Sequence, residues 1–152
     1  MRIALCDDDP LFSDIAESVI TNMGHQVVGV APNPAAAVSL LETTLPDVAV
    51  IDMAMGFGSD FDMVGRSMEL GIGTIVFSQG VDDSVLGHYD PRPEMVLKPD
   101  FDRLEGAIHH AVAAREAAGD GDRRVRPQRA AQGPRPSHVA DAQAFYEALN
   151  HA

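Results

Sequence analysis

The chain alternates between short apolar runs and segments whose apolar positions recur at helical spacing. Five runs have the length and composition of buried β-strands, at residues 3–6, 26–31, 48–51, 74–77 and 95–97. The segment after the first run, residues 10–23, has the apolar pattern of an amphipathic helix. Asp9-Pro10 and Asn33-Pro34 each place a capping side chain before a proline, so we expect helices to begin there.

The later part of the chain repeats this alternation. We expect three further helices, from about residue 60 to before Gly71, around residues 82–87, and from Phe101 to about Ala118. Strict strand–helix alternation favours a parallel sheet with helices on both faces and right-handed crossovers. The sequence therefore predicts an α/β fold, a flavodoxin-like doubly wound sheet of five parallel strands in the order 2-1-3-4-5.

The composition changes after residue 118. Residues 119–136 are almost free of apolar side chains, which predicts a flexible linker. Residues 137–152 regain an apolar face through Val139, Phe145 and Leu149, so this tail has the pattern of a short amphipathic helix. We therefore expect one folded domain at residues 1–118, followed by a flexible C-terminal tail.

Charge and cysteine content restrict the function classes. The chain has 23 acidic and 11 basic residues, a formal net charge of −12, and this charge repels nucleic acid and anionic membrane surfaces. No apolar stretch has membrane-spanning length, and the N-terminus lacks the pattern of an export signal. The single cysteine, Cys6, lies in the first apolar run and is expected to be a buried, reduced thiol. These features are typical of a cytoplasmic protein that binds neither nucleic acid nor membrane.

Side chains capable of chemistry occupy the ends of four predicted strands. Asp7 and Asp8 come after the first strand, Asp52 after the third, Ser78 after the fourth and Lys98 after the fifth. Strands one and three are neighbours in the order 2-1-3-4-5, so Asp7, Asp8 and Asp52 should converge at one edge of the sheet. Three carboxylates repel one another unless a cation neutralises them, and Mg²⁺ suits a small set of oxygen ligands.

These residues resemble the receiver domain of two-component response regulators. The resemblance covers residues 1 to about 118 and rests on four features, which are Asp7-Asp8, the run from Pro46-Asp47 to Asp52, Ser78, and Lys98-Pro99. Each feature is weak when taken singly. Together they form a specific set, because they occur in the family's order at the ends of four strands.

The resemblance implies that Asp52 accepts a phosphoryl group from a phosphohistidine on a sensor histidine kinase or a phosphotransfer protein. The implied Mg²⁺ ligands are Asp7 (through water), Asp8, Asp52 and the backbone carbonyl of Ala54. Ser78 and Lys98 would stabilise the phosphoryl group. The chain would then be a stand-alone response regulator receiver that signals to a downstream protein by contact. It would not be an enzyme, and its chemistry would be limited at most to its own phosphorylation and dephosphorylation.

Three departures from the family pattern affect how such a signal would be read. Met95, three residues before Lys98, stands where the family usually has an aromatic switch residue, and methionine does not reproduce a ring. Gly56, four residues after Asp52, stands where proline is common. Only 20 positions separate Ser78 from Lys98. The surface around the fourth helix and the fifth strand is therefore expected to be remodelled.

Two alternatives stay open at this point. The departures at Met95 and Gly56 suit a receiver-like scaffold that works without phosphorylation. The acidic residues would also serve a small Mg²⁺-dependent phosphohydrolase with Asp52 as its nucleophile. That class usually has a second acid two residues after the nucleophile to act as a general acid, and this chain has Ala54 there.

Overall fold

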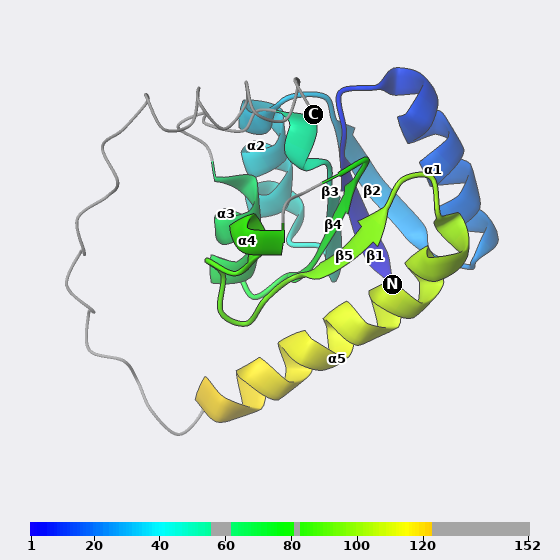
Figure 1. The fold of residues 1–152 in the computed structure, drawn as a ribbon. Coiled ribbons are helices and arrows are strands. Elements are labelled where there is room, and N and C mark those ends of the chain that lie inside the picture. Colours follow the sequence, from blue (N-terminus) through cyan, green and yellow to red (C-terminus); the bar gives the residue numbers. More distant parts are fainter. Residues whose placement is uncertain (56–61, 81–82, 123–152) are drawn as a thin grey trace, which may run out of the picture.

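A computed structural model of the chain describes residues 1–55, 62–80 and 83–122 (Figure 1). The five strands form one sheet in the order β2-β1-β3-β4-β5, and every neighbouring pair is parallel. The strands are β1 (Arg2–Cys6), β2 (Gln26–Ala31), β3 (Val48–Ile51), β4 (Gly73–Ser78) and β5 (Glu94–Leu97). The predicted fold class and strand order are confirmed.

Helices cover both faces of the sheet. They are α1 (Pro10–Asn22), α2 (Pro34–Thr44), α3 (Met63–Glu69), α4 (Asp83–Leu86) and α5 (Leu104–Asp122). Figure 1 shows α1 and α5 on one face and α2, α3 and α4 on the other. In the part of the chain that the structure describes, no helix combines the length and hydropathy needed to cross a membrane.

The starts of α1 and α2 follow the predicted capping chemistry. The Asp9 carboxylate accepts hydrogen bonds from the backbone N–H groups of Leu11 and Phe12, at 3.0 and 3.2 Å. The Asn33 side chain accepts one from Ala36 N–H at 2.9 Å. In each case a proline follows the cap, where the missing N–H leaves no helical hydrogen bond unmade.

The ends of the later helices differ from the predictions. Helix α3 begins at Met63, because the Asp62 carboxylate caps it by accepting from Gly65 N–H at 2.8 Å. Helix α5 follows a short 3-10 turn at Phe101–Arg103 and runs to Asp122. It passes Gly119 and Gly121, since each glycine costs a helix only about 1 kcal/mol. The helix therefore includes the first four residues of the predicted linker. Residues 123–136 and the tail to residue 152 lie outside the described residues, as do Gly56 and Phe61.

The alternating side chains of the strands fill two cores. Ile3 and Leu5 of β1 point to the core beneath α1 and α5, whereas Ala4 and Cys6 point to the core beneath α2 and α3. Cys6 is buried and unpaired, as predicted, and burial raises the pKa of its thiol to about 12. The core side chains are nearly all apolar, so the sheet is held mainly by apolar burial.

Asp47 anchors α5 to the edge of the sheet opposite the carboxyl ends of the strands. Its carboxylate accepts from Arg2 N–H at 2.8 Å and from the Arg115 guanidinium at 3.2 Å. The hydrogen bond from Arg2 N–H is the largest cause that holds the pKa of Asp47 below its usual value, and the hydrogen bond from Arg115 lowers it further. Helix α5 also passes so close to Gly73 that a Cβ atom there would lie 2.9 Å from the carbonyl oxygen of Ala111. These contacts fix the sheet and α5 as one unit.

Candidate functional site

The carboxyl ends of four strands bring the candidate residues to one edge of the sheet. Asp7 directly follows β1, Asp52 follows β3, Ser78 ends β4 and Lys98 follows β5. Backbone hydrogen bonds align these ends, from Asp52 N–H to the carbonyl of Cys6 at 2.8 Å and from Lys98 N–H to that of Ser78 at 3.0 Å. The sequence therefore positions the side chains through strand register.

The Asp52 carboxylate is buried and hydrogen-bonded at both oxygens. Its exposed fraction is 7%. Oδ1 accepts from the backbone N–H of Ala54 at 2.9 Å and from the Ser78 hydroxyl at 3.0 Å. Oδ2 accepts from Lys98 Nζ at 2.6 Å. These three donors fix the orientation of the carboxylate, a group that can act as a nucleophile toward phosphorus.

Asp7 lies beside Asp52 and shares its lysine. Asp7 Oδ2 accepts from Lys98 Nζ at 2.5 Å, and Oδ1 accepts from Asp9 N–H at 2.9 Å. Asp8 is exposed, yet it offers a carboxylate oxygen within 4.8 Å of those of Asp7 and Asp52. The predicted convergence of the three acids is therefore present.

Lys98 is buried between the two carboxylates. Its side chain is 6% exposed and forms ion pairs with Asp7 and Asp52. Burial alone would lower the pKa of Lys98, but the hydrogen bonds to Asp52 and Asp7 outweigh burial and raise the pKa above its usual value. The ammonium therefore stays charged at neutral pH and is a fixed positive charge beside Asp52.

The donor set fits a hard divalent cation. Three carboxylates face one ammonium in this cluster, so the ionised groups carry a net negative charge. Their oxygens are the ligand type that Mg²⁺ prefers, and Asp8 and Ala54 are exposed at the rim, where an ion can keep several waters. The three carboxylates that the resemblance implies as Mg²⁺ ligands thus lie together.

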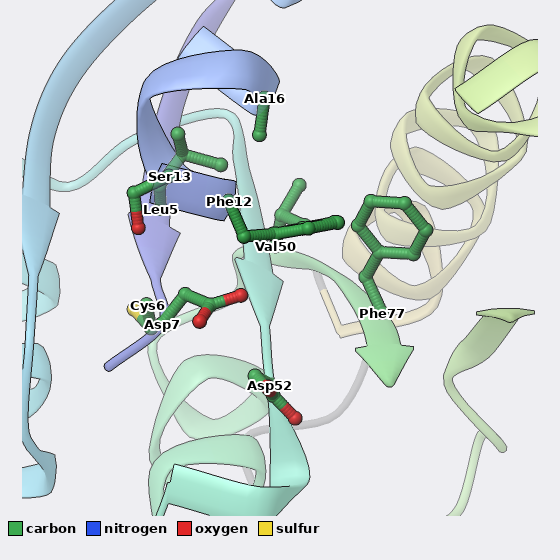
Figure 2. A pocket seen from close by; sticks show the side chains of 9 residues that line it. All are labelled: Leu5, Cys6, Asp7, Phe12, Ser13, Ala16, Val50, Asp52 and Phe77. Carbon is green, nitrogen blue, oxygen red and sulfur yellow. The ribbon is translucent and has the colours of Figure 1, made fainter. Parts of the chain in front are cut away.

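A small cavity lies next to the carboxylates (Figure 2). Asp7 and Asp52 line one side of it, and Phe12, Ser13 and Phe77 line the other. Its volume is about 10 Å³, which is the space of one water molecule. The Ser13 hydroxyl is buried and has no hydrogen-bond partner among the described residues. The cavity is too small for an organic substrate, so a reacting group must approach Asp52 from the outer rim.

A tyrosine, Tyr89, lies in the segment before Met95, the position at which the receiver family usually has an aromatic switch residue. Met95 is partly buried and packs against the core beneath α3 and α4, and Tyr89 packs against the same core. The Tyr89 hydroxyl donates to the Asp62 carboxylate at 2.9 Å, so it links the segment after α4 to the cap of α3. Burial is the largest cause that raises the pKa of Tyr89, and the negative charge of Asp62 raises it further. This contact could not be predicted from the sequence, because Tyr89 lies in an irregular segment without periodicity.

Comparison with curated proteins gives two partial matches, and no protein-family model matches the chain. An uncharacterised 14.6 kDa protein of Leptolyngbya boryana is 41% identical over 70 residues, which cover 46% of this chain. Protein-glutamate methylesterase/protein-glutamine glutaminase 3 of Burkholderia thailandensis is 30% identical over 117 residues, or 73% of this chain. The chain spans only 53% and 32% of the lengths of these two proteins.

Several solved structures match over nearly their whole length. The signal receiver domain of a modulated diguanylate cyclase from Desulfovibrio desulfuricans superposes with a TM-score of 0.65 at 19% identity, covering 77% of this chain and 97% of that one. A response regulator receiver domain from Clostridium thermocellum gives 0.65 at 18% identity, covering 77% and 98%. Both matches extend over nearly the whole of the solved domains. The described part of the chain therefore has the fold of response regulator receiver domains.

Proposed function

We propose that the chain is a phosphorylation-dependent switch in which Asp52 accepts a phosphoryl group from a phosphohistidine of a partner protein. The observation that carries this proposal is the set of partners around one buried carboxylate. Asp52 has Lys98 Nζ at 2.6 Å on one oxygen and the Ser78 hydroxyl at 3.0 Å on the other. The chain has the fold of response regulator receiver domains, and in open α/β sheets ligands bind at the carboxyl ends of the strands.

In the proposed transfer, a carboxylate oxygen of Asp52 attacks the phosphorus atom of the phosphohistidine. The new P–O bond forms as the P–N bond breaks, and the imidazole nitrogen keeps the electron pair and takes up a proton. Lys98 and Ser78 then turn from the carboxylate to the phosphoryl oxygens, where an ammonium and a hydroxyl both stabilise negative charge. Asp7, Asp8, Asp52 and the carbonyl of Ala54 would hold Mg²⁺. The ion would supply positive charge that reduces repulsion between Asp52 and an anionic donor.

Repeated turnover on small phosphates is a weaker interpretation of the same acids. Ala54 stands two residues after Asp52, where a hydrolase of this kind needs a general acid. We therefore propose a phosphoacceptor that signals by protein contact, with no catalytic turnover of its own.

The test is incubation of the chain with Mg²⁺ and phosphoramidate, a small donor with the P–N bond of phosphohistidine. Intact-mass measurement should show one added phosphoryl group. Binding of Mg²⁺ without any mass change would support the receiver-like scaffold instead. Steady release of phosphate over many turnovers would support the hydrolase.

Exposed apolar side chains beside the site support a protein donor. Leu11 is 69% exposed and Ile15 is 45% exposed on α1. The helix begins directly after the acidic residues, and the Asp9 side chain caps Leu11 N–H itself. A phosphohistidine protein that reaches Asp52 from the rim would cover this turn of α1. We therefore place its docking surface on Leu11 and Ile15.

Leu11→Glu should slow phosphotransfer from a histidine kinase by roughly tenfold or more, because a charge would replace a central apolar contact. The rate with phosphoramidate and Mg²⁺ should stay within about twofold of the parent rate, since a small donor needs no docking surface. The control is Leu45→Glu, which changes an exposed leucine at the other edge of the sheet. Equal slowing with both donors would show that Leu11 supports the site itself and would refute the docking role.

A further inference from the structure

The ammonium of Lys98 has a third neighbour besides the two carboxylates. Lys98 Nζ lies 4.0 Å from the centre of the Phe12 ring, which belongs to α1. An ammonium has three N–H donors, and two of them are accounted for by Asp7 and Asp52. The electron-rich ring face takes the place of a third acceptor at a position where the side chain is only 6% exposed.

The Phe12 ring is itself held by two other rings. It stacks on Phe101 at a centroid distance of 5.4 Å and packs at a tilt against Phe77 at 5.3 Å. Figure 2 shows Phe12 and Phe77 together above Asp7 and Asp52. Phe77 directly precedes Ser78, and Phe101 opens the turn before α5. These contacts leave the ring little freedom to rotate away from Lys98.

We propose that Phe12 is a positioning residue for Lys98. The face of the Phe12 ring holds the Lys98 ammonium beside the two carboxylates, so that the ammonium meets the phosphoryl group as transfer occurs. This inference rests on the proposed function of Asp52. Without the ring, the flexible lysine side chain would populate other rotamers and reach the phosphoryl oxygens less often. The position of the Lys98 ammonium would then depend on Phe12 of α1, which lies 86 positions earlier in the sequence.

The contact can be measured directly, because Lys98 is the only lysine in the chain. Labelling with ¹³C-lysine gives one set of side-chain signals, and the Hε protons of the parent should be shifted upfield by the ring current. Phe12→Leu should remove most of this shift, and Phe12→Tyr should retain it. Phe101→Leu is the comparison variant, since it removes a ring that stacks on Phe12 but leaves the ring nearest Lys98 Nζ in place, and it should reduce the shift less than Phe12→Leu does.

The functional role is measured by the rate of phosphorylation with phosphoramidate and Mg²⁺. Phe12→Leu should be about three- to thirtyfold slower than the parent, the range expected for losing one buried cation–π contact. Phe12→Tyr should recover the rate, and Phe101→Leu should change it much less. The proposal is overturned if Phe12→Leu keeps the parent rate, or if the folded Phe12→Tyr is as slow as Phe12→Leu. A parent that never gains a phosphoryl group would refute the proposed function alone, because the NMR shift tests the ring contact without phosphate.

Discussion

Asparagine in place of Asp52 is expected to abolish phosphoryl uptake and to leave the fold intact. The amide keeps an oxygen that can accept from Ala54 N–H and the Ser78 hydroxyl, so these two hydrogen bonds survive, whereas the one from Lys98 Nζ is lost. It is no nucleophile, and Lys98 still has Asp7 as its partner. Intact mass after incubation with phosphoramidate and Mg²⁺ should show no added group, and circular dichroism should match that of the parent.

The control for this result is Asp14→Asn, the same chemical change at an exposed residue of α1. It should accept one phosphoryl group at the parent rate. An Asp52→Asn protein that still gains the group would assign the acceptor role to another residue. Peptide mapping of the phosphorylated variant would then identify that residue, and the interpretation of the site would change.

Much of the fold could be predicted because each local signal agreed with the others. The Asp9-Pro10 and Asn33-Pro34 caps fixed two helix starts, and alternation of strands and helices fixed a parallel sheet. Asp7, Asp8 and Asp52 then converged because β1 and β3 are neighbours in register, with Cys6 opposite Ile51. Strand ends are therefore predictable wherever topology alone brings them together.

The partners within the site could not be predicted, because they depend on packing between distant segments. Lys98 reaches Asp52 across 46 positions and Asp7 across 91. Phe12 lies in the predicted helix of residues 10–23, but the helical pattern contains no information that its ring lies against Lys98. The Tyr89–Asp62 hydrogen bond was missed for a similar reason, since it joins two irregular segments 27 positions apart.

Position 95 holds methionine and not an aromatic residue, and two sets of packing contacts connect the surroundings of the site to the helices. On one face, Met95 and Tyr89 pack on the core beneath α3, where Tyr89 bonds to the cap of that helix. On the other face, Phe12 connects Lys98 to α1 and, through Phe101, to the turn before α5. Only the second set includes the Lys98 ammonium, which is itself hydrogen-bonded to Asp52.

Lys98→Met should reduce the free energy of unfolding by about 3 kcal/mol at pH 7 without divalent ions, the lower end of the cost of breaking a buried ion pair. Asp7 and Asp52 are each 7% exposed, and both would lose their common counter-charge. Methionine keeps an unbranched chain of similar length, so the loss would reflect charge more than packing. Urea unfolding in the presence of EDTA measures the difference.

Two further measurements separate the charge effect from a general packing defect. At one fixed concentration, Mg²⁺ should stabilise Lys98→Met more than it stabilises the parent, since the ion replaces the missing positive charge; at about 100 times its dissociation constant the gain is about 2.7 kcal/mol. The double variant Lys98→Met/Asp7→Asn should be more stable in EDTA than Lys98→Met alone, because it removes one of the two repelling carboxylates. If Lys98→Met matches the parent in EDTA, the short contacts of Lys98 do not stabilise the folded chain in solution. If it is unstable and neither Mg²⁺ nor Asp7→Asn helps, the loss comes from packing around the lysine stem.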